Sequence, residues 1–113
     1  DDFQQLIIGK GYDHNYIINK KNVDDYVFAG VCESPKTGIK MEIYTSQPGI
    51  QLYTGNWMTG NFVGKNGQRY PKRSAVCFET QHYPDSINHP EYPSIVLRPG
   101  EIFRSRTTYK FSI

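Results

Sequence analysis

The segment EIFRSRTTYKFSI (residues 101–113) has the clearest periodicity in the chain. Every second residue from Phe103 to Ile113 is aromatic, aliphatic or a small hydroxyl residue, and the residues between them are Arg, Lys, Thr and Ser. Since side chains alternate between the two faces of a strand, this pattern predicts a long antiparallel β-strand with one apolar face and one face in water. The Pro and Gly of Arg98–Gly100 predict the turn that precedes it.

Further segments predict β-strands, and helical periodicity is hard to find. Residues 39–46 alternate between apolar and polar side chains, and residues 26–32 form a more continuous apolar run. The segment between them is rich in turn formers, so the two predict a β-hairpin with a longer loop. Shorter strands are expected at 49–55 and 74–81. The residues therefore favour an all-β fold.

Length, charge and composition limit the function. The 113 residues suffice for one domain, and the net charge of +2 comes with no basic stripe, so nucleic acid is not expected as a partner. No long apolar segment predicts a membrane span. The chain begins without Met and without a signal peptide, which suggests a trimmed chain or a fragment and a cytoplasmic location.

The two cysteines, Cys32 and Cys77, are far apart and lack the paired spacing of a zinc site. We expect both to be small buried hydrophobic residues, and whether they form a disulfide stays open. Two long irregular segments, 56–73 and 83–94, contain several Gly and Pro residues together with aromatic side chains. Loops of this length in a compact domain are usually functional or disordered, and their aromatic content argues against disorder.

The polar stretch CFETQHYPDSINHP (77–90) contains the first candidate for chemistry. If 74–81 is a strand, Glu79 shares a face with Ala75, Cys77 and Gln81, whose small size at two positions leaves room for a ligand. From these residues alone, Glu79 is either a catalytic carboxylate or a charged surface residue at the end of a strand.

Two other sites in this stretch have weaker support. A metal site would use His82, Asp85, His89 and Glu91, but their spacing fits no standard ligand pattern and two prolines intervene. A nucleophile pair of Cys77 and His82 lacks a residue that orients the base. We expect neither a metal nor another cofactor.

Four stretches occur together in an order that resembles one family. They are GYDHNY (11–16), QPGIQLYTGN (47–56), CFETQHYPDSINHP (77–90) and LRPGEIFRSRTTYKF (97–111). In this order they resemble the aldose 1-epimerases, also called galactose mutarotases. Members of that family are much longer, and nearly the whole of this chain is similar to their C-terminal part only.

The resemblance implies an antiparallel β-sandwich that forms the C-terminal portion of a larger β-supersandwich. It implies that residues 1–113 are a single domain or a fragment, a split subunit included, and that an N-terminal part of the same enzyme is a partner. The implied activity is that of an isomerase, which interconverts the α and β anomers of aldohexoses such as galactose and glucose.

The resemblance also assigns roles to three residues. Glu79 corresponds to the general base, which takes the proton of the anomeric hydroxyl while an acid protonates the ring oxygen. Asp13 and Gln51 correspond to residues that bind sugar hydroxyls, for which a carboxylate and an amide are suited. On the residues alone, Asp13 could instead serve a turn and Gln51 could be a polar strand residue that faces water.

The general acid of the family is a histidine of the N-terminal part, which also supplies a further histidine and an arginine for sugar binding. None of the three histidines here, His14, His82 and His89, corresponds to that acid. The resemblance therefore implies that the acid comes from another part of the enzyme. The alternative function is a non-catalytic carbohydrate-binding module of the same fold, against which the retained Glu79 argues because a binding module needs no base.

Overall fold

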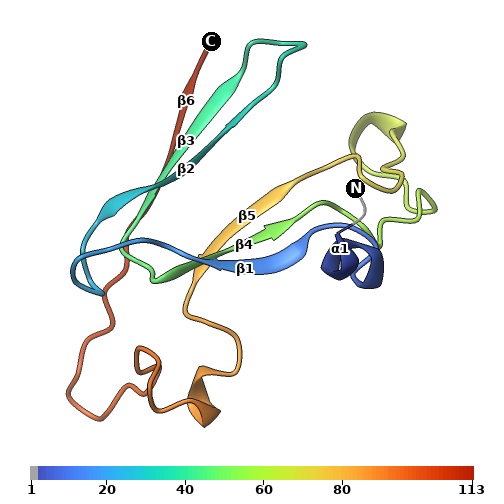
Figure 1. The fold of residues 1–113 in the computed structure, drawn as a ribbon. Coiled ribbons are helices and arrows are strands. Elements are labelled where there is room, and N and C mark those ends of the chain that lie inside the picture. The colour runs from blue at the N-terminus through green and yellow to red at the C-terminus, as the bar shows by residue number, and fades with distance from the viewer. Residues whose placement is uncertain (1–2) are drawn as a thin grey trace. The chain divides into compact units, whose positions relative to one another are not determined.

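The computed structural model describes residues 3–113, which form two compact units (Figure 1). One unit comprises the residues up to Tyr16 together with Gln51–Glu79, and the other comprises Ile17–Ile50 and Thr80–Ile113. The elements in chain order are α1 (Gln4–Ile8), β1 (Asp13–Ile17), β2 (Val27–Glu33), β3 (Lys40–Thr45), β4 (Gly49–Tyr53), η1 (Lys65–Gly67), β5 (Cys77–Gln81), η2 (Ser86–Asn88) and β6 (Thr107–Ser112). The prediction of a β-rich chain with very little helix is confirmed.

The second unit contains an antiparallel sheet of strand order β2-β3-β6. The expected hairpin is confirmed, because β2 pairs with β3 and the amide of Ser34 donates to the carbonyl of Ile39 across the loop. The alternation of residues 39–46 is also confirmed in part: Ile43 and Thr45 of β3 are buried. On the other face of β3, Glu42 forms an ion pair with Lys110 of β6 at 3.0 Å.

The core of the second unit is small. Among residues 3–113 the buried hydrophobic side chains are those of Ile18, Ile43 and Ile50. Beside Ile43, a chain of three hydroxyls links Thr45, Thr107 and Thr80, with oxygen–oxygen distances of 3.1 Å and 2.6 Å. These hydrogen bonds satisfy hydroxyls that would otherwise be costly to bury.

The predicted strand 101–113 is wrong over its first half. Pairing with β3 begins at Thr107, opposite Thr45, and residues 101–106 are irregular. The apolar face that the alternation predicts is present but not buried, since Phe111 is 66% exposed and Ile113 is fully exposed. The physical reason is that β6 is an end strand of the order β2-β3-β6: it pairs with β3 on one side, and no strand among residues 3–113 pairs with its other side.

Strand β5 begins at Cys77, so the prediction that it starts at residue 74 is also wrong. The prediction of two buried cysteines is wrong as well, because Cys77 of β5 is exposed and Cys32 of β2 is half-buried. Both thiols are free. Cys77 lies on an end strand of the order β1-β4-β5, where covering side chains are fewer than at a central strand.

The first unit contains α1 and most of the sheet β1-β4-β5. Its strands β1 and β4 are locked together just outside their paired ends by the buried side chain of Asn56, whose amide nitrogen donates to the carbonyl of Tyr12 at 2.7 Å. Gly11 lies directly against this amide: a Cβ at Gly11 would lie 2.0 Å from Asn56 Oδ1, and its φ of 135° is one that other residues rarely adopt. This close approach fixes the backbone two residues before Asp13.

No helix among residues 3–113 is long and apolar enough to cross a membrane.

Candidate functional site

Asp13 and Gln51, which are 38 positions apart in the sequence, form a hydrogen-bonded pair. Asp13 is the first residue of β1 and Gln51 is the central residue of the neighbouring strand β4. The Nε2 atom of Gln51 donates to Oδ1 of Asp13 at 2.8 Å. A bond of this kind requires both side chains on the same face of the sheet, so two of the three predicted site residues are brought together.

The Gln51 amide has a fixed orientation in this pair. A carboxylate is an acceptor, so the amide nitrogen must face Asp13 and the amide oxygen must point elsewhere. That oxygen is buried and has no hydrogen-bond partner among residues 3–113. An unpaired buried acceptor is costly, and a donor such as a ligand hydroxyl would relieve the cost. Asp13 itself is exposed, which leaves its carboxylate accessible to a ligand.

His14 holds the backbone of Asp13. The amide of Asp13 donates to Nδ1 of His14 at 3.0 Å, so Nδ1 acts as an acceptor and the neutral ring carries its proton on Nε2. The ring also makes an edge contact with Tyr12, with centroids 6.2 Å apart. The sequence analysis considered His14 only as a candidate for the general acid and missed this contact. The one signal for it was the place of His14 directly after Asp13 in the motif GYDHNY.

Glu79 is the central residue of β5, the strand next to β4 on the side away from β1. Its side chain is exposed, and within residues 3–113 its carboxylate has no hydrogen bond or ion pair. A carboxylate without a partner remains available to accept a proton from a ligand. Among residues 3–113 no hydrogen bond joins Glu79 to Asp13 or Gln51.

Three residues of the rejected metal site, Asp85, His89 and Glu91, contact one another within the loop that contains them. The His89 ring lies between two carboxylates, with Nε2 3.5 Å from Asp85 and Nδ1 3.0 Å from Glu91, and it stacks on Tyr92 at 4.7 Å. A hydrogen bond from its own backbone, followed by that from His89, lowers the pKa of the Glu91 carboxyl. His82 lines a separate cleft of about 940 Å³ in the second unit. Among residues 3–113 no group of three or more His, Cys, Asp or Glu is arranged to hold a metal ion.

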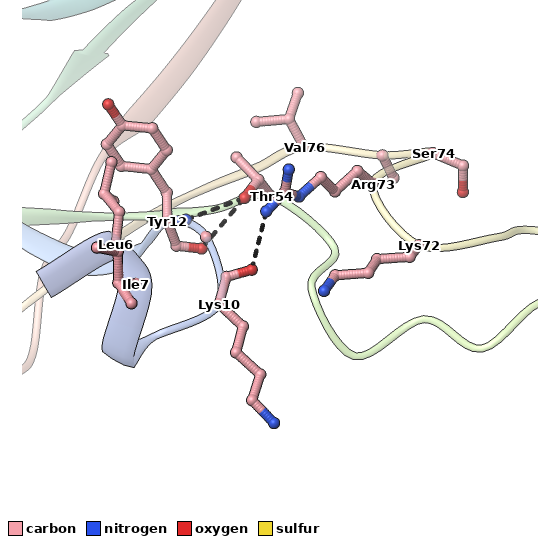
Figure 2. Close-up of a pocket in the computed structure, with 11 residues that line it drawn as sticks. Leu6, Ile7, Lys10, Tyr12, Thr54, Lys72, Arg73, Ser74 and Val76 are labelled. Atoms are coloured by element: carbon pink, nitrogen blue, oxygen red, sulfur yellow. Dashed lines mark hydrogen bonds between the residues drawn. The ribbon is translucent and has the colours of Figure 1, made fainter. Parts of the chain in front are cut away.

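A cleft of about 730 Å³ lies at the end of the sheet in the first unit. Figure 2 shows the side chains that line it. Tyr12 and Thr54, which lie just outside β1 and β4, contribute to it, and Arg73 donates to the carbonyl of Lys10 at 3.1 Å. By the alternation along each strand, Tyr12 and Thr54 point to the face opposite Asp13 and Gln51. The cleft is therefore separate from the Asp13–Gln51 pair. Its lining consists of Leu6, Ile7, Lys10, Gly11, Tyr12, Thr54, Lys72, Arg73, Ser74, Ala75 and Val76.

Comparison with known proteins identifies the family. The family model described as aldose 1-epimerase matches residues 1–110. The chain belongs to the aldose 1-epimerase family. It is 45% identical over 103 residues to galactose mutarotase of Mus musculus, a match that covers 91% of this chain and 30% of that protein. It is 34% identical over 113 residues to aldose 1-epimerase of Escherichia coli K12, covering 98% of this chain and 32% of that protein.

A solved structure of the family has the same fold. The crystal structure of an aldose epimerase homologue from C. elegans superposes with a TM-score of 0.78 at 31% identity, over 89% of this chain and 30% of that one. The chain thus spans about a third of the length of these relatives and matches their C-terminal region. The family and fold that the four motifs implied are confirmed.

Proposed function

We propose that this chain supplies the base and part of the sugar-binding surface of an aldose 1-epimerase that interconverts the α and β anomers of galactose and glucose. The observation that carries the proposal is the hydrogen bond between Gln51 and Asp13, two polar residues from separate motifs on neighbouring strands. Relatives named galactose mutarotase and aldose 1-epimerase support the reaction and the class of substrate.

Asp13 and Gln51 bind the sugar hydroxyls in this proposal. The exposed carboxylate of Asp13 accepts hydrogen bonds from hydroxyl groups, and a bond to a charged acceptor contributes more than a neutral one. The unpaired Oε1 of Gln51 accepts a hydrogen bond from a further hydroxyl while its Nε2 stays bonded to Asp13. Because Gln51 and Asp13 also hold each other, they present a preorganised surface to the sugar.

Glu79 acts as the general base. It removes the proton from the anomeric hydroxyl while an acid protonates the ring oxygen, so the C1–O5 bond breaks and an open-chain aldehyde forms. Rotation about C1–C2 turns the other face of the carbonyl toward the ring hydroxyl. Closure then reverses the proton transfers, with Glu79 returning its proton to the carbonyl oxygen. The position of Glu79 on the strand beside Gln51, with no competing partner in residues 3–113, supports this role.

The acid belongs to the N-terminal part of a family-length enzyme in this proposal. General acid and general base catalysis each contribute typically about 10²–10⁴-fold, so a chain with the base alone loses most of the activity. For the isolated chain, the intact Asp13–Gln51 pair favours a second function, the binding of a sugar without its conversion.

Polarimetry on freshly dissolved α-galactose tests the proposal. The isolated chain is compared with a fused polypeptide, in which the N-terminal part of the Mus musculus relative precedes this chain. We expect the isolated chain to stay near the spontaneous rate and the fused polypeptide to be active. Replacing Asp13 by Ala should raise KM in the fused polypeptide, and replacing Asp24, which lies outside the pair, should not. Full activity of the isolated chain would contradict the proposal and would make His82 and His14 the first acids to test.

A further inference from the structure

The cleft whose lining side chains Figure 2 shows, which we call the cationic cleft, is lined by three cations and by no anion. The cations are Lys10, Lys72 and Arg73, and none of the other residues that line it is Asp or Glu. Within residues 3–113 none of the three forms an ion pair. An anion bound in the cleft would therefore meet positive charges that this part of the chain leaves unpaired.

Two of these cations are held by an unusual backbone conformation. Lys10 has a φ of 56° and Arg73 has a φ of 62°. The other non-Gly residues with positive φ among residues 3–113 are Asn66 and Asp85, whose residue types adopt this conformation more readily. The guanidinium of Arg73 donates to the carbonyl of Lys10 at 3.1 Å, so the two strained residues are joined at the cleft (Figure 2). Strain that is retained in this way is concentrated at ligand sites.

The cationic cleft also has an apolar lining. Leu6 and Ile7 of α1 contribute to it together with Ala75 and Val76, and Ile7 is 63% exposed and Val76 46% exposed. Its volume of about 730 Å³ lies within the range of small-molecule sites, about 300–1,000 Å³. An inorganic anion would leave the apolar side chains in water. A ligand that suits the whole cleft has a polyvalent anion joined to an apolar or aromatic body.

We propose that the cationic cleft binds an organic phosphate with an aromatic body, a ligand of the nucleotide class. The ammonium groups of Lys10 and Lys72 and the remaining N–H donors of Arg73 bind phosphate oxygens, and three cations suit a polyphosphate better than a single carboxylate. The aromatic body packs on the apolar lining. Because the cleft is on the face of the sheet opposite the Asp13–Gln51 pair, this site is additional to the sugar-binding surface and does not rest on the proposed function.

Calorimetric titration with ATP in buffer without magnesium tests the proposal, on this chain and on the fused polypeptide. We expect both to bind ATP in a one-to-one complex. Inorganic triphosphate and adenosine should each bind at least about tenfold more weakly than ATP, because each meets only one part of the cleft. Absence of ATP binding in either protein, or equal affinity for inorganic triphosphate and ATP, would overturn the proposal.

Lys72 is the position for a substitution, because its side chain has no hydrogen bond or ion pair within residues 3–113. Lys72→Gln should raise the dissociation constant of ATP by about tenfold, and Lys72→Arg should keep it near the wild-type value. Lys65→Gln is the matched control, because Lys65 is an exposed lysine of the same unit that does not line the cleft. Equal weakening by Lys65→Gln and Lys72→Gln would show diffuse attraction to the surface and would overturn the site.

The emission of Trp57 reports where ATP binds. The ammonium of Lys10 lies over the ring of Trp57, 5.0 Å from its centroid, and a phosphate bound to Lys10 alters this contact. Excited at a wavelength that adenine does not absorb, the single tryptophan should respond to ATP with the dissociation constant that calorimetry gives. Binding without a change in emission would place ATP outside the cleft and would overturn the proposal. An oligoglutamate peptide that binds more tightly than ATP would assign the cleft to an acidic protein and would also overturn it.

Discussion

Replacing Gly11 by Ala should destabilise the first unit strongly. The new Cβ would lie 2.0 Å from Oδ1 of Asn56, and that side chain is held because it bonds the carbonyl of Tyr12 at 2.7 Å and the hydroxyl of Thr54 at 2.8 Å. The positive φ costs an Ala about 1–3 kcal/mol, and a buried hydrogen bond that is broken without replacement costs about 1–3 kcal/mol more. We expect a total loss of roughly 2–6 kcal/mol in the free energy of unfolding.

Urea denaturation followed by the fluorescence of Trp57 measures this loss. Trp57 is the single tryptophan and follows Asn56 directly, so its emission reports on the first unit. Gly67→Ala is the matched control, because Gly67 also has a positive φ of 72° but nothing within 4 Å of an added Cβ. It should cost only the backbone strain, about 1 kcal/mol.

A double-mutant cycle with Asn56→Ala separates the contact from other effects. Asn56→Ala removes the side chain that clashes, so the double variant should be more stable than the sum of the single losses predicts, by about 1–3 kcal/mol. A Gly11→Ala loss within about 0.5 kcal/mol of the Gly67→Ala loss, or an additive cycle, would refute the reasoning.

The remaining predictions concern charge and thiols. The hydrogen bond from Lys110 lowers the pKa of the Glu42 carboxyl below its ordinary value of 4.5, so ionised Glu42 stabilises the second unit above that pH and the contribution is lost as pH falls through the lowered pKa. Between about pH 7 and about pH 3, the urea midpoint by circular dichroism should therefore fall more in the wild type than in Glu42→Gln, and parallel falls would contradict this. Cys77, being exposed, should react with a thiol reagent before the half-buried Cys32. Loss of the fast phase in Cys32→Ser rather than in Cys77→Ser would be the opposite result.

Local periodicity predicted the strands, and the limits of that prediction are physical. The alternation around Ile43 gave the hairpin and its buried face, because the two-residue period acts within a strand. The same period extended the last strand back to residue 101, but a strand forms only where a partner supplies hydrogen bonds, and among residues 3–113 that partner ends at Thr45. The exposure of Cys77 could not be predicted from periodicity either, because the burial of a side chain depends on which other parts of the chain cover its strand.

The candidate site was found through motifs and not through geometry. The motifs gave Asp13, Gln51 and Glu79 separately, and nothing in their spacing predicted that Gln51 would donate to Asp13 across two strands. The contact of Gly11 with Asn56 is likewise non-local, since the two residues are 45 positions apart and meet only after β1 and β4 pair.

The kinetics of Glu79→Gln in the fused polypeptide test the central claim most directly. The amide keeps the shape of the side chain and its ability to form hydrogen bonds, but it cannot take a proton at neutral pH. Polarimetry over a range of α-galactose concentrations should show kcat reduced by about 10²–10⁴-fold with a much smaller change in KM, while the control Glu33→Gln stays near the wild type. A Glu79→Gln enzyme with near wild-type kcat would contradict the account, because Glu79 would then not be the base.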